Sequence, residues 1–85
     1  MPTRDPTPGE VSHAMRQTRR ATGISRESLA SRSAVGFQSI RSYESGRVYP
    51  GLANLWRLCD TLDVSMDEYT GFAEYRRNKG RDIPQ

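Results

Sequence analysis

The segment from Ser25 to Gly46 constrains the fold more than any other part of the chain, because it contains the start and the end signals of two short helices. Ser25 is a preferred N-cap residue, since its hydroxyl accepts a hydrogen bond from a backbone N–H that the helix leaves unpaired. Gly36 is a tolerated cap for the second helix, and Gly46 suits the left-handed position just beyond its end. Ala34 and Val35 lie between the two helices and form a tight turn.

The apolar residues of this segment fall on one side of each helix. Leu29 and Ala30 are the apolar pair of the first helix, and Ile40 and Tyr43 are the buried positions of the second. The second helix therefore exposes its other face. This arrangement predicts a helix-turn-helix whose second helix enters a DNA major groove. The residues on the exposed face are Phe37, Gln38, Arg41 and Ser42.

A helix precedes this segment. Thr7 and Glu10 have the spacing of a capping box, and Pro8 is favoured at the first helical position. The helix is expected to run to about Thr22 and to end at Gly23. The residues expected to face the core at helical spacing are Val11, Met15, Thr18 and Thr22.

Two further helices follow Pro50, which prevents the preceding helix from continuing. Apolar residues recur at helical spacing between Leu52 and Leu62, and the expected apolar face is broad. A second capping box, Ser65 to Glu68, begins a last short helix that Gly71 ends. The chain is thus predicted to be all-α, with five short helices. The apolar stripe of the fourth helix consists of Leu52, Leu55, Trp56, Leu58, Cys59 and Leu62.

Composition excludes several classes of protein. The chain has 85 residues, which suits one domain, and its single cysteine, Cys59, cannot form an internal disulfide. Its single histidine, His13, has no nucleophile, carboxylate or cysteine partners at catalytic or metal-ligand spacing. No apolar run is long enough to span a membrane, and the N-terminus lacks a signal-peptide pattern. We therefore expect a cytoplasmic protein that is not an enzyme and has no metal or cofactor.

The charges are unevenly distributed along the chain. Residues 1–50 contain eight Lys or Arg and four Asp or Glu, whereas residues 51–71 contain one arginine and four acids. The basic half coincides with the predicted helix-turn-helix, as a surface facing DNA phosphates requires. Charge and motif together point to double-stranded DNA as the partner; no small-molecule ligand is evident.

The stretch from Val11 to Phe72 resembles the phage repressor and Cro type of helix-turn-helix domain, the XRE-like family. The resemblance implies a compact, lambda-repressor-like bundle. The family often has glycine at the position of Ala34, a Ser or Thr cap at Gly36 and a polar residue at Phe37. The matching residues are Ile24, Ser25, Glu27, Leu29, Ala30, Val35, Ser39, Ile40, Tyr43, Glu44, Gly46, Pro50, Leu55, Leu58, Leu62, Val64, Asp67 and Glu68.

The resemblance also implies roles for individual residues on the recognition helix. Related repressors read bases from the positions of Phe37, Gln38 and Ser42. Glutamine can pair bidentately with adenine, and Phe37 can contact a thymine methyl or pack on the turn. Arg41 can reach a guanine or a phosphate.

Phosphate contacts are expected from Ser25 and Arg26 at a helix N-terminus and from Arg47 in the loop after the recognition helix. Ser39 suits either a phosphate contact or packing. The resemblance further implies a buried ion pair between Arg19 and Glu44. The neighbouring arginines, Arg16 and Arg20, are expected to be solvated.

The predicted organisation is a disordered arm at 1–6, a DNA-binding domain at 7–72 and a basic flexible tail at 73–85. Most family members bind DNA as two-fold dimers, so a homodimer on DNA is expected, with Met66, Tyr69 and Phe72 at the contact. The first functional hypothesis is a sequence-specific transcriptional regulator, in particular a repressor. The alternative is a protein-interaction module or the antitoxin-like component of a toxin–antitoxin pair.

Overall fold

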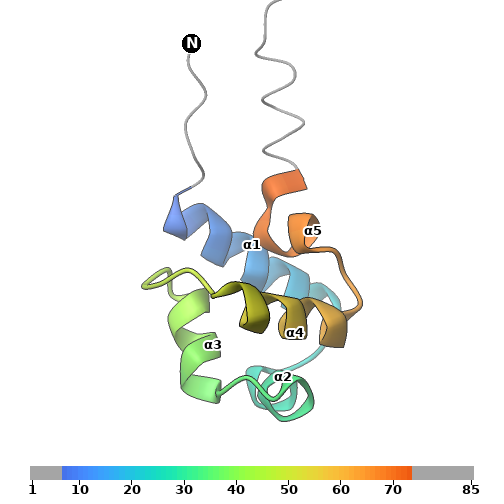
Figure 1. The fold of residues 1–85 in the computed structure, drawn as a ribbon. Helices are drawn as coiled ribbons and strands as arrows, with labels where there is room; N and C mark the ends of the chain where they lie inside the picture. Colours follow the sequence, from blue (N-terminus) through green and yellow to red (C-terminus); the bar gives the residue numbers. More distant parts are fainter. Residues whose placement is uncertain (1–6, 74–85) are drawn as a thin grey trace, which may run out of the picture.

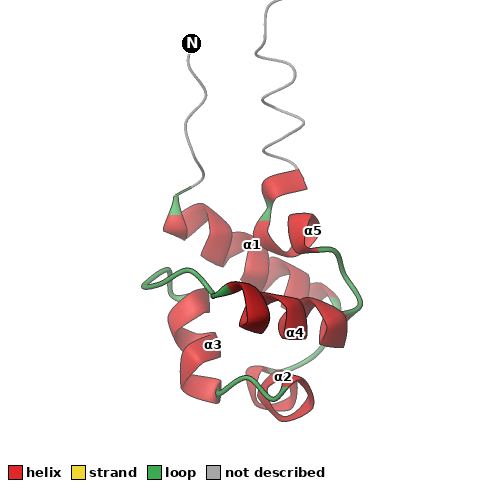
Figure 2. Ribbon diagram, in the orientation of Figure 1, coloured by secondary structure: helices red, strands yellow, loops and turns green. Residues whose placement is uncertain are grey.

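The computed structural model describes residues 7–73, which fold into five α-helices without a β-strand (Figures 1 and 2). This confirms the predicted all-α architecture. The predicted arm at 1–6 and all but the first residue of the predicted tail at 73–85 lie outside the described residues. The helices are α1 (Pro8–Ala21), α2 (Arg26–Ser33), α3 (Phe37–Glu44), α4 (Leu52–Leu62) and α5 (Met66–Thr70).

Three helices begin at hydroxyl side chains that cap them. The Thr7 side chain accepts a hydrogen bond from the Glu10 N–H, and the Glu10 carboxylate accepts one from the Thr7 N–H, which completes the capping box of α1. The Ser25 hydroxyl accepts the Ser28 N–H of α2, and the Ser65 hydroxyl accepts the Glu68 N–H of α5. The predicted box at Ser65 thus has its hydroxyl half. These caps satisfy N–H groups that the helices themselves leave unpaired, so the sequence fixes each start locally.

The turn between α2 and α3 contains a left-handed alanine. Ala34 ends α2 at φ 62° and ψ 23°, a conformation that is unfavourable for a residue with a Cβ. The buried Ser33 hydroxyl accepts a hydrogen bond of 3.2 Å from the Val35 N–H, which ties the two sides of the turn together. Val35 itself enters the core, so packing holds the strained turn in place.

The core lies where the five helices meet. Helix α1 packs against α3 and α5, α2 packs against α3 and α4, and α4 packs against α5. In Figure 1, α2 and α3 form one end of the domain and α5 lies beside α1 at the other. The buried apolar residues are Val11, Met15, Leu29, Val35, Ile40, Tyr43, Leu58, Cys59, Leu62 and Tyr69.

The prediction that the whole apolar stripe of α4 faces the core is wrong at two residues. Leu52 is 74% exposed and Trp56 is 58% exposed, whereas Leu58, Cys59 and Leu62 are buried. Successive residues of a helix are turned by about 100°. Trp56 therefore stands about a quarter turn from Leu55, at the edge of the buried stripe.

The predicted core face of α1 also needs correction at its C-terminal end. Thr18 is only partly buried, and Thr22 is exposed. The Thr22 hydroxyl donates to the Arg19 carbonyl oxygen at 2.7 Å, and the Thr22 backbone is already the C-cap of the helix. The buried polar positions of α1 are instead Ser12 and Arg19.

Candidate nucleic-acid interface

Helix α3 divides into a core-facing side and an outward side. Ile40 and Tyr43 are buried, and the Tyr43 hydroxyl accepts a hydrogen bond of 2.9 Å from the Asn54 side chain of α4. Gln38 and Arg41 are exposed on the outward side. The helix is thus anchored on one side while the other keeps polar groups in solvent.

The first turn of α3 adds an aromatic group to this outward side. Phe37 and Ser42 are partly buried, and the guanidinium of Arg41 lies 6.0 Å from the centre of the Phe37 ring. This separation is at the outer limit of a cation–π contact. Arg41 and Phe37 therefore share one patch of the surface, one helical turn apart.

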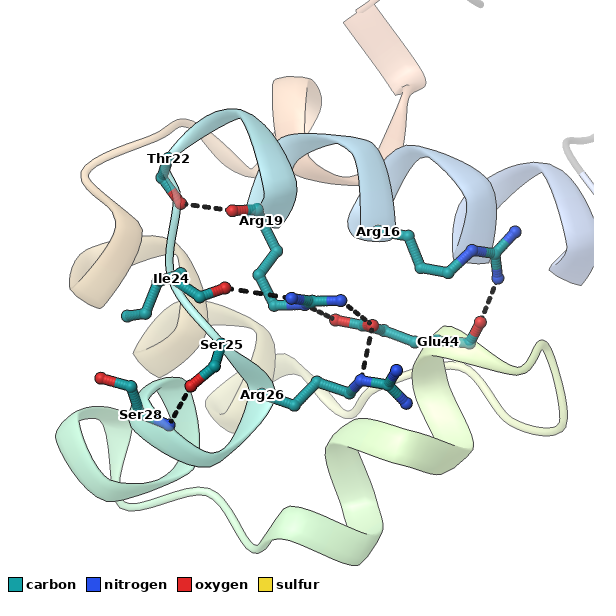
Figure 3. A network of polar contacts seen from close by, with 8 residues as sticks. All are labelled: Arg16, Arg19, Thr22, Ile24, Ser25, Arg26, Ser28 and Glu44. Atoms are coloured by element: carbon teal, nitrogen blue, oxygen red, sulfur yellow. Dashed lines mark hydrogen bonds and ion pairs between the residues drawn. The ribbon is translucent and has the colours of Figure 1, made fainter.

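A buried ion pair joins α3 to α1 (Figure 3). The Arg19 guanidinium donates to both carboxylate oxygens of Glu44, from Nε at 2.7 Å and from Nη2 at 3.0 Å. Its third nitrogen, Nη1, donates to the carbonyl oxygen of Ile24 at 3.0 Å. The pair implied by the family resemblance is thus present, and it fixes the end of α3 on the first helix.

Two further arginines approach Glu44 from opposite sides (Figure 3). The Arg26 Nε lies 3.7 Å from Oε1 of Glu44, and the Arg26 side chain is 42% exposed. Arg16 donates to the main-chain carbonyl oxygen of Glu44. The prediction that Arg16 is solvated is therefore wrong. Its spacing from Arg19 was the available signal, because residues three apart share a helix face.

These arginines border a cavity of about 330 Å³ that opens on the outward side of α3. The α1, α2 and α3 helices and the loop after α3 all contribute side chains to its wall. Polar side chains and arginines supply the entire lining, which includes one carboxylate. The lining residues are Arg16, Arg26, Gln38, Arg41, Ser42, Glu44, Ser45 and Arg47.

The remaining candidates for phosphate contacts surround the same end of the domain. Ser25 is exposed, and its hydroxyl accepts the Ser28 N–H at 3.1 Å, so its side chain serves the helix cap. Ser39 is partly buried in the first turn of α3. Arg47 is exposed in the loop that follows α3. Arg26 and Arg47 therefore lie on α2 and on this loop, and both border the cavity.

The candidate dimer residues do not share one environment. Tyr69 is fully buried in the core, so its assignment as a contact for a second copy is wrong. It falls on the inner side of a short helix, which the apolar residue type alone could not indicate. Met66 is partly buried, and Phe72 is 37% exposed. Met66 and Trp56 also border a second hollow, of about 420 Å³, between α4 and α5.

The histidine and the cysteine of the chain lie in different environments. His13 is exposed, and burial raises the pKa of the Cys59 thiol to about 11. Residues 7–73 contain no group of three or more His, Cys, Asp or Glu side chains that could hold a metal ion. Among those residues, no helix has both the length and the hydropathy needed to cross a membrane.

Comparison with known proteins places this architecture among helix-turn-helix domains. The sequence pattern of the helix-turn-helix family HTH_3 matches residues 15–69. Over 62 residues, the chain is 27% identical to the cryptic phage CTXphi transcriptional repressor RstR of Vibrio cholerae serotype O1, strain ATCC 39315 / El Tor Inaba N16961. That match covers 73% of the chain and 55% of the repressor, so the chain spans about half of that relative.

The fold has a counterpart among solved structures. An HTH_3 family transcriptional regulator from Vibrio cholerae superimposes with a TM-score of 0.73, at 19% sequence identity. The match covers 91% of this chain and 42% of the regulator. At this identity the likeness establishes the arrangement of the helices.

Proposed function

The chain belongs to the helix-turn-helix family HTH_3, and from this premise we propose that it binds double-stranded DNA sequence-specifically and regulates transcription. One observation carries the proposal. The outward side of α3 presents Gln38 and Arg41 to solvent, with Arg26 on α2 and Arg47 beyond α3 bordering the same cavity. Reading DNA needs base-contacting groups framed by phosphate-contacting groups, and this surface offers both.

Base contacts are assigned to the outward residues of α3. Gln38 is the principal reader, because its amide can pair with adenine N6 and N7 in the major groove. Ser42 lies one turn further along and can bond to several bases, so it contributes weaker discrimination. Phe37 offers an apolar contact to a thymine methyl, and Arg41 has the donors to reach a guanine edge or the backbone.

Phosphate contacts are assigned to the groups around that face. Ser25 and Arg26 stand at the N-terminus of α2, where backbone N–H groups and the helix dipole favour an anion. Arg47, in the loop after α3, is assigned to the phosphates on the opposite side of the DNA groove. Ser39 lies close to the start of α3 and contributes either a backbone contact or packing.

We further propose that the regulator is a repressor that acts in the cytoplasm as a homodimer on DNA. Repression is supported by the 27% identity to a protein named as a transcriptional repressor. A dimer would place two copies of α3 on half-sites about one helical turn apart. Met66 and Phe72, with the exposed Trp56, remain the apolar residues proposed for the contact.

The alternative, a protein-interaction module or antitoxin-like component, uses the same fold without reading DNA. The arginines around the outward side of α3 favour DNA, because a phosphate backbone needs such a frame and an interaction module does not. The two functions differ in the role of that face. A sequence-specific regulator would bind duplex DNA through this face, whereas an interaction module would not.

Selection of bound sites from a pool of random duplex DNA tests the proposal. The expected result is enrichment of one motif, and an inverted repeat with half-sites about one helical turn apart would report the dimer. A single half-site would contradict the dimer alone. Failure to enrich any sequence at low salt would contradict sequence-specific DNA binding.

A further inference from the structure

The cavity beside α3 contains more positive charge than its surroundings balance. Arg16, Arg26, Arg41 and Arg47 all border a volume of about 330 Å³. Glu44 is the one carboxylate in the lining, and Arg19 already donates to both of its oxygens. Arg26 also lies 3.7 Å from this carboxylate, and a single shared carboxylate cannot balance four lining arginines. An anion between these arginines is therefore electrostatically favoured.

The arginines come from different parts of the chain. Arg16 is on α1, Arg26 on α2, Arg41 on α3, and Arg47 in the loop after α3. A hydrogen bond to the Glu44 carbonyl holds Arg16, and the nearby Glu44 carboxylate orients Arg26 (Figure 3). Two of the four guanidinium groups are thus positioned before any ligand arrives, which lowers the entropic cost of binding.

The neutral lining has the chemistry of the same kind of ligand. Gln38 and Ser42 carry an amide and a hydroxyl that can donate hydrogen bonds to oxygen, whereas the Ser45 hydroxyl already donates to the Ser42 carbonyl oxygen at 3.0 Å. Guanidinium groups match the oxygens of a phosphate with paired, charge-assisted hydrogen bonds. The lining lacks an apolar floor on which a base or another ring could stack. A compact phosphate group fits these donors better than a whole nucleotide does.

We propose that this cavity is a preformed seat for a single phosphate group, in which Arg16 is a principal contact together with Arg26, Arg41 and Arg47. The inference rests on the proposed function for the source of the phosphate, a phosphodiester of the DNA backbone. It adds a contact from the first helix, outside the helix-turn-helix itself. It also assigns Arg41 to the phosphate rather than to a base.

Arg16 then has two linked roles. It bonds the last residue of α3 and faces the seat, so the phosphate and the recognition helix are held by one side chain. A backbone phosphate in the seat would therefore set the position of α3 along the groove. Phosphate contacts of this kind determine register rather than sequence preference.

The first test uses inorganic phosphate as the probe. Phosphate is titrated into the nitrogen-15-labelled chain at constant ionic strength, balanced with sodium chloride, and the arginine Nε–Hε and backbone amide resonances are followed. We expect saturable shifts confined to the cavity residues. Arg16→Gln should weaken phosphate binding about tenfold. Arg16→Lys keeps the charge but loses the paired guanidinium donors, so its phosphate affinity should lie between those of Arg16→Gln and the unaltered chain.

Arg20→Gln is the matched control, because Arg20 is an exposed arginine on the same helix and does not border the cavity. It should leave phosphate binding unchanged. Equal losses in Arg16→Gln and Arg20→Gln would overturn the seat, as would shifts spread over all basic residues or no saturable binding. Circular dichroism of each variant separates lost binding from lost folding, and Arg47→Gln tests the seat without touching the Glu44 network.

The second test measures duplex DNA affinity against salt concentration. Arg16→Gln should reduce the slope of log affinity against log salt by about one charge, whereas Arg20→Gln should not. Phosphate binding at the cavity without any affinity for duplex DNA would support the seat and overturn the proposed function. DNA binding with an unchanged slope in Arg16→Gln would overturn the DNA backbone as the source of the phosphate and leave the proposed function intact.

Discussion

Arg19 of α1 holds Glu44 of α3 through two hydrogen bonds, of 2.7 and 3.0 Å, and both side chains are almost inaccessible to solvent. The two residues lie 25 positions apart, so this contact is a tertiary link between α1 and α3. A charge buried in this way depends on its partner. Removal of Arg19 leaves the buried Glu44 carboxylate with the longer ion pair to the partly exposed Arg26, at 3.7 Å, in place of two short hydrogen bonds.

Arg19→Met should therefore destabilise the domain by about 3–5 kcal/mol. Arg20→Met, one position further along the same helix and exposed, should change stability by less than about 0.5 kcal/mol. Urea unfolding followed by circular dichroism measures both. The double variant Arg19→Met with Glu44→Leu should recover part of the loss, because it removes both charges. Equal, small effects of the two single variants would show that the ion pair does not constrain the fold.

Ala34→Gly should stabilise the domain. Ala34 has φ 62°, where a Cβ is unfavourable by about 1–2 kcal/mol. Glycine has more conformational entropy to lose on folding, which offsets about 0.5–1 kcal/mol of this gain. The net gain in the free energy of unfolding should be up to about 1.5 kcal/mol, measured by thermal or urea unfolding. Ser31→Gly, at an exposed position within α2, is the control and should be destabilising. A loss of stability in Ala34→Gly would contradict the strain at this turn.

Tyr69→Phe should also stabilise the domain, by about 1 kcal/mol, because the Tyr69 hydroxyl is buried without a hydrogen-bond partner among the described residues. Tyr43→Phe provides the opposite case. The Tyr43 hydroxyl accepts a hydrogen bond from Asn54, so its removal should cost about 1 kcal/mol. The two free energies of unfolding should move in opposite directions, and a shared sign would refute this interpretation.

Stability should fall as the pH rises above 9. Burial raises the pKa of the Cys59 thiol from 9.0 to about 11. Between these values the unfolded chain releases the proton while the folded chain retains it, so higher pH favours unfolding. Below pH 9 both states keep the proton and the thiol makes no pH-dependent contribution. Burial, and then the charge of Glu44, raise the pKa of Tyr69 as well, which extends the decline to higher pH.

Urea midpoints measured at intervals from pH 8 to 10.5 give the slope. Cys59→Ala removes the titrating thiol, so its midpoint should fall less steeply across this window even if its starting stability is lower. If the urea midpoint of Cys59→Ala falls with pH as steeply as that of the unaltered chain, the thiol is not the source of the pH dependence.

Gln38→Ala should relax base preference at one position of each half-site, by about 1–3 kcal/mol of discrimination. Gln17→Ala, at an exposed position on α1, is the control and should leave the selected motif unchanged. Selection from randomised duplexes with each variant compares the motifs directly. If the motif of Gln38→Ala matches that of the unaltered chain, another residue reads the base.

The helices and their ends were predictable because their signals are local. The Thr7 and Glu10 capping box and the N-cap at Ser25 each depend on residues within one turn, and the structure has them as predicted. The exposure of Trp56 was not predictable, because it depends on how far the neighbouring helices extend across the edge of α4. Residue type gave the wrong answer there, since tryptophan is normally counted as apolar.

The candidate site shows the same limit. The outward residues of α3 follow from helical spacing, whereas the contact from Arg16 to the Glu44 carbonyl depends on how α1 crosses α3. The family resemblance supplied the Arg19 and Glu44 pair but did not supply Arg16. The burial of Tyr69 likewise depends on the orientation of a five-residue helix, which no periodicity in so short a segment can define.

The division of α3 into an anchored side and an outward side bears on how such a domain diversifies. Ile40, Tyr43 and Glu44 carry the contacts with the rest of the fold, while Gln38 and Arg41 are solvent-exposed. Exchanges at exposed surface positions usually change stability by less than about 0.5 kcal/mol. Under the proposed function, descendants of this chain can therefore acquire new binding preferences by stepwise exchange of outward residues, with each intermediate still folded.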